Sequence, residues 1–360
     1  MSDTATNDVI DSYADTIRQA GVQRHQLRMR GSGSKDFYGG SLSGKVLDTR
    51  RYSGIVSYEP QELVLTARAG TPLAEIEKLL SENGQMLPFE PPHFGAGATL
   101  GGCVATGLSG PRRAYQGAAR DYVLGVRMLD GRGDMLTFGG QVMKNVAGYD
   151  VSRLQAGAMG TLGLLLEISL KILPSPATET TLRFDLDQAQ ALEMMNRWAG
   201  ISLPLSGSCY HEQVLTVRLS GVEKAVQAAK ISMGGEVAEQ GMKFWCDLRE
   251  QRDVFFQAAQ PLWRISLPST APPLSFKESG AAKQLIEWGG ALRWCSTEVD
   301  AQTVRSIAVA ADGQATLFRG GDKAAGVFHI LPEPLMKIHR NLKQSFDPDG
   351  IFNYGRLYDF

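Results

Sequence analysis

Two glycine-rich segments hold the residues whose types and spacing best suit chemistry. They are RMRGSGSK at 28–35 and ATLGGCVATG at 98–107. Glycine lets backbone N–H groups approach an anion closely, so two such loops can grip one pyrophosphate from opposite sides. One loop alone is more often an ordinary tight turn. Two, joined to the motifs further along the chain, favour a dinucleotide site.

Neither segment is the usual nucleotide fingerprint. Gly31 and Gly33 are followed by Asp36 where GxGxxG requires a glycine, and no Gly-Lys-Ser/Thr of a P-loop occurs in either segment. The second part of the chain alternates strands and helices without a glycine loop between them, which disfavours cofactor binding there.

The elements around the first loop predict how it is presented. Residues 8–19 have helical spacing and are followed by Gly21, and 27–30 read as a strand that runs straight into the loop. Further on, 62–68 read as a strand, and Thr71 caps a helix that starts at Pro72 and stops at Gly84.

Three more segments complete the prediction for the first part of the chain. Residues 122–129 and 134–138 flank Asp-Gly-Arg-Gly, a hairpin signal. Residues 166–172 alternate apolar and polar side chains, as in a half-exposed strand, and end at Pro174-Ser175-Pro176. That proline pair predicts a domain boundary.

The rest of the chain reads as an α+β unit followed by a helix and a turn-rich tail. Strands are predicted at 180–184, 213–219 and 242–248, with helices at 188–198 and 222–231. The last helix, at 334–346, is predicted to turn Leu335, Ile338, Leu342 and Phe346 inward.

The amino-acid composition limits the classes of function that the protein can have. The chain has 360 residues, 43% of them hydrophobic, and a formal charge of −1, which predicts a soluble protein of two domains without a nucleic-acid partner. Its apolar runs are too short for a membrane span, and the N-terminus shows no secretory signal, so we expect a cytoplasmic location. The four cysteines are far apart, which disfavours an iron–sulfur cluster or a zinc site.

Four segments together resemble a known family. They are RGSGSK, LPFEPPHFGAGATLGGCVATG at 87–107, KNVAGYDVSRLQAGAMGTLGLLLEISLKILP at 144–174 and FDPDGIFNYGRLY at 346–358. They resemble the PCMH-type (vanillyl-alcohol-oxidase type) FAD-binding proteins, and among these the FAD-binding E subunits of bacterial glycolate oxidase (glycolate dehydrogenase) complexes.

The resemblance implies an α+β fold in three parts. These are a PCMH-type FAD-binding domain of two subdomains at 1–175, an α+β cap at 176–320, and a C-terminal segment at 321–360 that returns to the flavin domain. It also implies a set of FAD-binding residues. They are Arg30, Gly31, Ser32, Gly33, Ser34, Lys35, Pro91, Pro92, Gly101, Gly102, Thr106, Gly107, Gly163, Leu164 and Asn353.

Two positions depart from the pattern that the family implies. Many relatives attach the flavin covalently through a histidine just after the first glycines, but Ser34 stands there, so we expect non-covalent FAD. Tyr354 replaces the proline of the family's closing Asn-Pro-Gly turn. His93 is either a flavin neighbour or a partly buried structural histidine.

Catalysis of 2-hydroxy-acid oxidation needs a cation for the carboxylate and a base for the hydroxyl proton. The candidates by position are Lys144, Tyr149, Arg153 and His329. A structural role is an equal alternative for each: Lys144 and Arg153 as solvated charges, Tyr149 as a packed ring, and His329 as a polar group at a strand end. The His-Glu metal cluster of relatives that oxidise 2-hydroxy acids is missing, and we expect no metal.

Two hypotheses follow from the resemblance. In the first, the chain is the FAD-dependent subunit of a complex that oxidises glycolate to glyoxylate and passes electrons to an iron–sulfur partner and quinone. In the second, it is a flavin-fold scaffold that organises a catalytic sister flavoprotein subunit. Both imply a 2-hydroxy acid as substrate of the complex, and contact with the inner face of the cell membrane only through partners.

Overall fold

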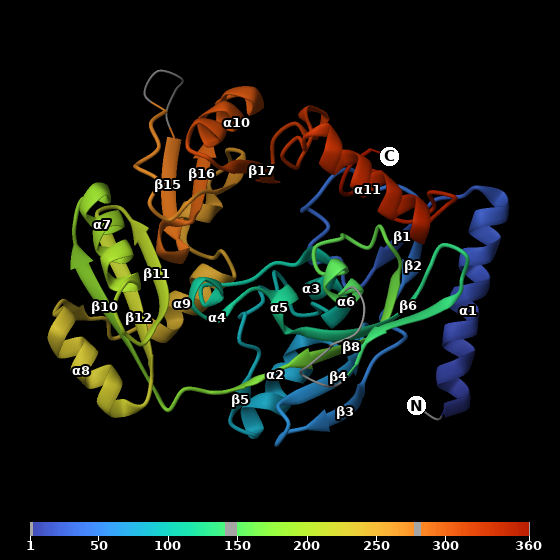
Figure 1. The fold of residues 1–360 in the computed structure, drawn as a ribbon, viewed down its shortest axis with the longest axis horizontal. Helices are drawn as coiled ribbons and strands as arrows, with labels where there is room; N and C mark the ends of the chain where they lie inside the picture. The colour runs from blue at the N-terminus through green and yellow to red at the C-terminus, as the bar shows by residue number, and fades with distance from the viewer. Residues whose placement is uncertain (1–2, 141–149, 277–281, 360) are drawn as a thin grey trace.

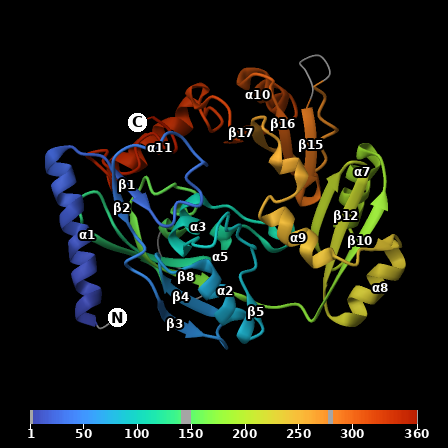
Figure 2. The ribbon, with the colours of Figure 1, turned by 180° about the vertical axis from the view of Figure 1, so that it is seen from behind.

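The computed structural model describes residues 3–140, 150–276 and 282–359 of the chain. Figure 1 shows two lobes, each built on its own large sheet, with the C-terminal helix α11 (Glu333–Phe346) beside the first lobe. Seen from behind in Figure 2, helix α1 (Asp3–Gln23) lies at the end of the molecule away from helix α8 (Glu223–Met233) of the second lobe. The mixture of helices packed on antiparallel sheets confirms the predicted α+β class.

The first lobe begins with a long helix and a two-stranded parallel sheet. These are α1 (Asp3–Gln23), β1 (Leu27–Arg30) and β2 (Lys45–Asp48). The strand at 27–30 is confirmed with its predicted bounds. The prediction that Gly21 closes α1 is wrong, because the helix continues to Gln23 and the chain turns at Arg24, which has a φ of 52°.

A five-stranded antiparallel sheet forms the other half of the lobe, in the order β3-β4-β8-β6-β7. The strands are β3 (Ile55–Glu59), β4 (Val64–Arg68), β6 (Val123–Leu129), β7 (Met135–Gly139) and β8 (Leu164–Lys171). The predicted hairpin of β6 and β7 is confirmed. The prediction of a half-exposed strand at 166–172 is wrong, because β8 is the central strand and core side chains cover both of its faces.

Short elements join these strands and carry the second glycine loop. They are α2 (Leu73–Glu82), α3 (Leu100–Thr106), α4 (Arg113–Gln116), α5 (Ala119–Tyr122), α6 (Val151–Leu154), and the paired strands β5 (Gln85–Met86) and β9 (Leu173–Pro174). The predicted Thr71 cap of α2 is wrong. Pro72 occupies the cap position, and the Thr71 hydroxyl instead bonds the backbone of Gly54.

The second lobe is one eight-stranded sheet in the order β13-β10-β12-β11-β15-β16-β14-β17. Its strands are β10 (Thr178–Asp185), β11 (Leu205–His211), β12 (Val214–Gly221), β13 (Glu236–Val237), β14 (Leu262–Ser266), β15 (Ala282–Glu287), β16 (Leu292–Thr297) and β17 (Gln314–Arg319). The predicted boundaries at 175 and 320 fall outside these strands, and the division into domains stays a prediction.

Helices accompany this sheet. They are α7 (Gln188–Ala199), α8 (Glu223–Met233), α9 (Gly241–Arg249) and α10 (Ala301–Ala310), with single 3-10 turns at Val254–Gln257, Trp288–Gly290 and Lys323–Ala325. The prediction of a strand at 242–248 is wrong. Gly241, Trp245 and Leu248 are the buried positions, and their spacing of four and three is that of one helix face.

The C-terminal helix α11 (Glu333–Phe346) is confirmed, and Phe346 packs against the core as predicted, but the predicted inward positions of Leu335 and Ile338 are wrong. Leu335 and Ile338 are 47% and 53% exposed, whereas Lys343 is buried. The Lys343 ammonium satisfies its charge with the Asp347 carboxylate at 2.6 Å and with two backbone carbonyl oxygens. Three acceptors match the three donors of an ammonium, which explains how a lysine replaces an apolar residue there.

Candidate functional site

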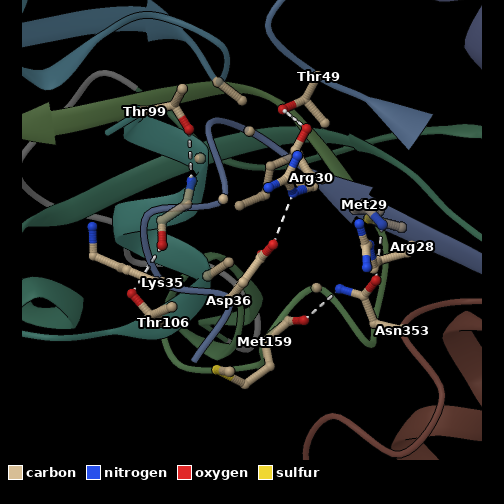
Figure 3. A pocket seen from close by; sticks show the side chains of 18 of the residues that line it. Arg28, Met29, Arg30, Lys35, Asp36, Thr49, Thr99, Thr106, Met159 and Asn353 are labelled. Carbon is tan, nitrogen blue, oxygen red and sulfur yellow. Dashed lines mark hydrogen bonds and ion pairs between the residues drawn. The ribbon is translucent and has the colours of Figure 1, made fainter. Parts of the chain in front are cut away.

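A cleft in the first lobe collects both glycine loops and the C-terminal tail (Figure 3). It has a cavity volume of about 110 Å³ and is partly open to solvent. Predicted site residues that line it are Arg30, Gly31, Ser32, Gly33, Ser34, Lys35, Gly101, Gly102, Thr106, Gly163, Leu164 and Asn353. Segments more than 300 residues apart in sequence therefore meet at one site, as the two-loop hypothesis requires.

Three of the predicted cofactor residues do not line this cleft. Pro91 and Pro92 are buried, and Pro92 faces a different cavity. Gly107 ends α3 with a φ of 62° and packs its Cα against the backbone of Gly157. Their positions suit a role in shaping the second loop, because each holds the chain that leads into or out of α3.

The first loop offers unused backbone donors. The N–H groups of Gly31, Ser32 and Gly33 make no hydrogen bond to another described residue, and Ser34 N bonds only the Ser32 hydroxyl, at 3.3 Å. Gly33 has a φ of 81°, which favours glycine. Successive free N–H groups in one turn form a concave anion site, so this loop suits a phosphate.

The second loop approaches the first without room for side chains. A Cβ on Gly31 would collide with the Thr99 hydroxyl, and one on Gly101 would lie 2.9 Å from the Ala69 Cβ. Gly102 is different, because a Cβ there would meet only the Thr99 Oγ1, at 3.3 Å. The two loops are therefore packed against each other at Gly31, Gly101 is packed against Ala69 at the end of β4, and Gly102 borders the cleft.

Hydroxyl groups fix the second loop in place. Thr99 Oγ1 accepts a hydrogen bond from Gly102 N at 3.3 Å and caps α3. Thr106 Oγ1 donates to Gly102 O at 2.9 Å (Figure 3). The Thr106 proton is thus already committed to the helix backbone, and the hydroxyl can offer a ligand only its oxygen lone pairs.

Charge in the cleft is predominantly positive. The charged side chains among its described lining residues are Arg28, Arg30, Lys35, Arg356 and Asp36. Asp36 accepts from Arg30 Nε at 2.8 Å, which leaves three cations without a carboxylate partner in the lining. A pyrophosphate carries the negative charge that this surplus would balance, so the residues present fit a dinucleotide.

Lys35 is one of two buried cations among the described residues of the cleft, together with Arg356. It is 7% exposed, and its Nζ donates to the backbone oxygen of His93 at 3.1 Å. Burial lowers the pKa of the Lys35 ammonium below its usual range. An anion bound nearby would restore that pKa, because an opposite charge favours the protonated form.

Asn353 joins the tail to the cleft. Its Oδ1 accepts from Met29 N at 2.8 Å and its Nδ2 donates to Met159 O at 2.6 Å (Figure 3). The residue has a φ of 43°, a conformation that asparagine tolerates better than most residues. These two hydrogen bonds hold the closing turn although Tyr354 stands where the family places a proline.

The predicted catalytic residues that the structure describes do not line the cleft. Lys144 and Tyr149 lie outside the described residues. Arg153 pairs with Asp150 at 2.9 Å and is about half exposed, and His329 lies near the C-terminal tail, where its carbonyl accepts from a tyrosine hydroxyl. Neither lines the cleft, and burial lowers the pKa of His329.

His93 has a structural role, which is one of the two interpretations that its sequence position allowed. Its Nε2 lies 3.1 Å from the Glu77 carboxylate, and its backbone N–H donates to Glu250 of the cap. The side chain is mostly buried and does not line the cofactor cleft. It therefore joins α2, the second-loop approach and the cap.

Sequence reasoning missed several residues that line the cleft. They are Arg28, Met29, Asp36, Leu42, Thr49, Ala69, Thr99, Ala105, Met159, Gly160, Leu165 and Arg356. Thr99 carried a usable signal, because a threonine directly before a glycine-rich helix start is typical of an N-cap. Arg28 and Arg356 carried none, since each resembles a solvated charge in the sequence.

The described ranges 3–140, 150–276 and 282–359 contain neither a metal-binding cluster nor a membrane-spanning helix. No three His, Cys, Asp or Glu side chains there are grouped so that they could hold a metal ion. No helix in those ranges has the length and apolar character needed to cross a membrane.

Comparison with known proteins identifies the fold and the family. The FAD binding domain family matches residues 8–139. The chain is 48% identical over 351 residues to the glycolate oxidase subunit GlcE of Escherichia coli (strain K12), covering 98% of both chains. It is 33% identical over 156 residues to the glycolate oxidase subunit GlcD of Bacillus subtilis (strain 168), covering 42% of this chain and 33% of that one.

A solved structure of similar fold is alkyldihydroxyacetonephosphate synthase, with a TM-score of 0.63 and 17% identity over 94% of this chain and 74% of that chain. At that identity the likeness shows the fold alone. The PCMH-type flavin domain with a cap and a returning C-terminal segment is thereby confirmed, and FAD is the cofactor. The chain belongs to the family of the glycolate oxidase subunit GlcE, whose members are FAD-dependent oxidoreductase subunits.

Proposed function

We propose that this chain is the FAD-holding subunit of a complex that oxidises glycolate to glyoxylate and passes the electrons to an iron–sulfur partner and then to quinone. The observation that carries the proposal is the first glycine loop, whose free N–H groups face a cleft with surplus positive charge. The end-to-end similarity to a subunit named for glycolate oxidase supports the choice of substrate.

The chain's own residues would hold the cofactor in a definite way. The N–H groups of Gly31, Ser32 and Gly33 would donate to phosphate oxygens, and Arg28 and Arg356 would balance the charge. FAD, when bound, supplies the acceptor for the two electrons and two protons that leave glycolate. Asn353 keeps the tail closed over the same cleft.

The first prediction concerns the attachment of FAD. Ser34 stands in the place of the covalent histidine, and the described residues lining the cleft include no histidine, cysteine or tyrosine. We therefore expect acid precipitation of the purified chain to release its flavin into the supernatant, measured by absorbance. Flavin that stays in the washed pellet would contradict non-covalent binding, and a colourless protein that FAD does not stabilise against heat would contradict the cofactor itself.

The second prediction concerns the partners. We propose that the chain works beside a catalytic flavoprotein sister subunit and an iron–sulfur subunit, on the cytoplasmic side of the membrane, which it reaches through them. The FAD-loaded chain alone should reduce an artificial dye with glycolate roughly tenfold or more slowly than the co-purified complex.

The same comparison tests the scaffold hypothesis. Equal rates for the isolated chain and the complex would remove the partner requirement and make Lys144, Tyr149 and His329 the first residues to mutate. If the chain binds FAD but glycolate reduces that FAD neither in the isolated chain nor in the complex, the chain is a scaffold and the sister subunit performs the oxidation.

A further inference from the structure

The two faces of the large sheet in the second lobe are covered differently. Helix α7 packs against Tyr210, Leu215 and Ile286 on one face, and α8 packs against Leu219 on that same face. Because successive side chains of a strand point to opposite faces, the residues next to these point away from both helices. On that second face, beside α9, lies a groove with a volume of about 670 Å³.

The groove has a buried floor and an exposed rim. Cys209 of β11, Thr216 of β12 and Leu285 of β15 form the floor, and each is no more than 4% exposed. Glu236 and Val237 of β13, the strand at the edge of the sheet, lie at the exposed rim. The described residues that line the groove and those that line the cofactor cleft do not overlap, so FAD does not account for the groove.

The groove crosses much of the sheet. Its lining includes residues of β13, β10, β12, β11 and β15, which are five neighbours in the sheet order. At roughly 4.8 Å between neighbouring strands, the groove is about 19 Å long. That length matches about six residues of an extended chain or roughly three turns of a helix. The groove therefore suits a segment of polypeptide better than a small metabolite.

The rim of the groove is acidic. The charged or titratable side chains among its described lining residues are Glu212, Glu236, Glu239, Asp247 and Asp253 against Arg183, Lys243 and His211. Asp247 already pairs with Lys243, and Asp253 accepts from Phe255 N at 2.9 Å. The carboxylates of Glu212, Glu236 and Glu239 make no hydrogen bond or ion pair with another described residue. Arg183 is likewise unpaired within the described part of the chain, and it offsets one of these three charges.

Apolar side chains lie among these charges. Val237 is 49% exposed, Val214 and Phe244 are half-buried, and all three line the groove. Exposed apolar side chains rimmed by charged ones are typical of protein-binding surfaces. A second copy of the chain would bring the same acids face to face across a two-fold axis, and an anionic membrane would be repelled in the same way. The occupant that fits is a basic segment of a different protein.

We propose that this groove is a docking site for a basic segment of a partner protein. The apolar side chains of that segment pack on Val214, Val237 and Phe244, and its lysine or arginine side chains meet the free carboxylates of the rim. The identification of the partner as a sister subunit of the oxidising complex rests on the proposed function. The docking site itself rests on the length of the groove, its unpaired acids and its exposed apolar side chains.

The test is co-purification of the partner with the tagged full chain from cells that produce the whole complex. Glu236→Lys combined with Glu239→Lys should reduce the partner recovered per chain roughly tenfold or more, because like charges then face each other across the interface. Glu193→Lys combined with Glu223→Lys is the matched control. It changes the net charge by the same amount on α7 and α8, on the opposite face of the sheet, and should leave recovery unchanged.

A second measurement uses the unchanged chain and does not depend on the folding of a variant. Hydrogen exchange of the backbone amides at 211–216 and 236–248 should be slower in the complex than in the isolated chain, whereas exchange in α7 and α8 should not change. Slower exchange in the complex that leaves both groove segments unaffected would overturn the proposal. Unchanged recovery of the partner with the folded Glu236→Lys, Glu239→Lys variant would overturn it as well.

Failure of the docking proposal can be distinguished from failure of the proposed function. If no partner co-purifies with the unchanged chain, the docking site is wrong, while reduction of a dye by glycolate still tests the proposed function. A partner that leaves with the charge-reversed variant, in a complex that does not oxidise glycolate, would support the docking site and contradict the proposed function.

Discussion

Gly102→Val should abolish FAD binding while the chain still folds. Outside the backbone of α3 itself, the described residues place only the Thr99 hydroxyl oxygen near a Cβ at this position, at 3.3 Å, so the fold can accept a side chain with a small shift. Gly102 lines the cofactor cleft, however, and a branched side chain there would occupy the space that a phosphate needs. We expect flavin per purified chain to fall roughly tenfold or more.

Two neighbouring substitutions are the controls. Gly101→Val should instead reduce stability, because its Cβ would lie 2.9 Å from the Ala69 Cβ and 3.0 Å from the Ala69 carbonyl oxygen. Cys103→Ala should keep its flavin, since Cys103 is 1% exposed and packs in the core behind the loop. Normal flavin content in Gly102→Val would show that the cofactor does not approach this loop.

Local signals explain which parts of the site could be predicted. The strand at 27–30, the loop that follows it and the hairpin at β6 and β7 each depend on residues that are close in sequence. Glycine spacing and turn residues report such local geometry directly. The two glycine loops lie about seventy residues apart. The sequence predicts that they meet at one site only because both have the glycine pattern of an anion-binding loop.

Long-range partners explain the errors. Lys343 looks like a solvated charge on the polar side of α11, yet it is buried because Thr161, 182 residues earlier, provides a carbonyl oxygen. Arg293 likewise resembles an ordinary strand residue, yet it is fully buried and donates to the backbone oxygens of Gly290 and Ala271. The sequence pattern reports periodicity, whereas these burials depend on which segment lies opposite.

The same limit applies to catalysis. His329 and Arg153 are candidates because they stand in segments that resemble the family, yet neither lines the cofactor cleft. Resemblance of a segment gives no information on which way its side chains point once the chain is folded.

Lys343→Met should destabilise the protein by about 3–5 kcal/mol, because it leaves the Asp347 carboxylate buried without its cation. Lys337→Met, on the exposed side of the same helix, should change stability by no more than about 0.5 kcal/mol. The measurement is the free energy of unfolding in urea. A loss in Lys343→Met no larger than in Lys337→Met would contradict the structural role of the pair.

The Lys343→Met substitution should also weaken FAD binding, because the Lys343–Asp347 ion pair holds the C-terminal tail that enters the cofactor cleft. Asp347 accepts from the N–H groups of Ile351 and Phe352, and the next residue is Asn353, which bonds Met29 and Met159. Replacing both Lys343 and Asp347, as Lys343→Met with Asp347→Asn, removes the unpaired charge and should destabilise less than the sum of the two single changes. If FAD affinity falls in Lys343→Met and partly recovers in the double variant, the buried ion pair positions the tail over the cofactor as well as stabilising the fold.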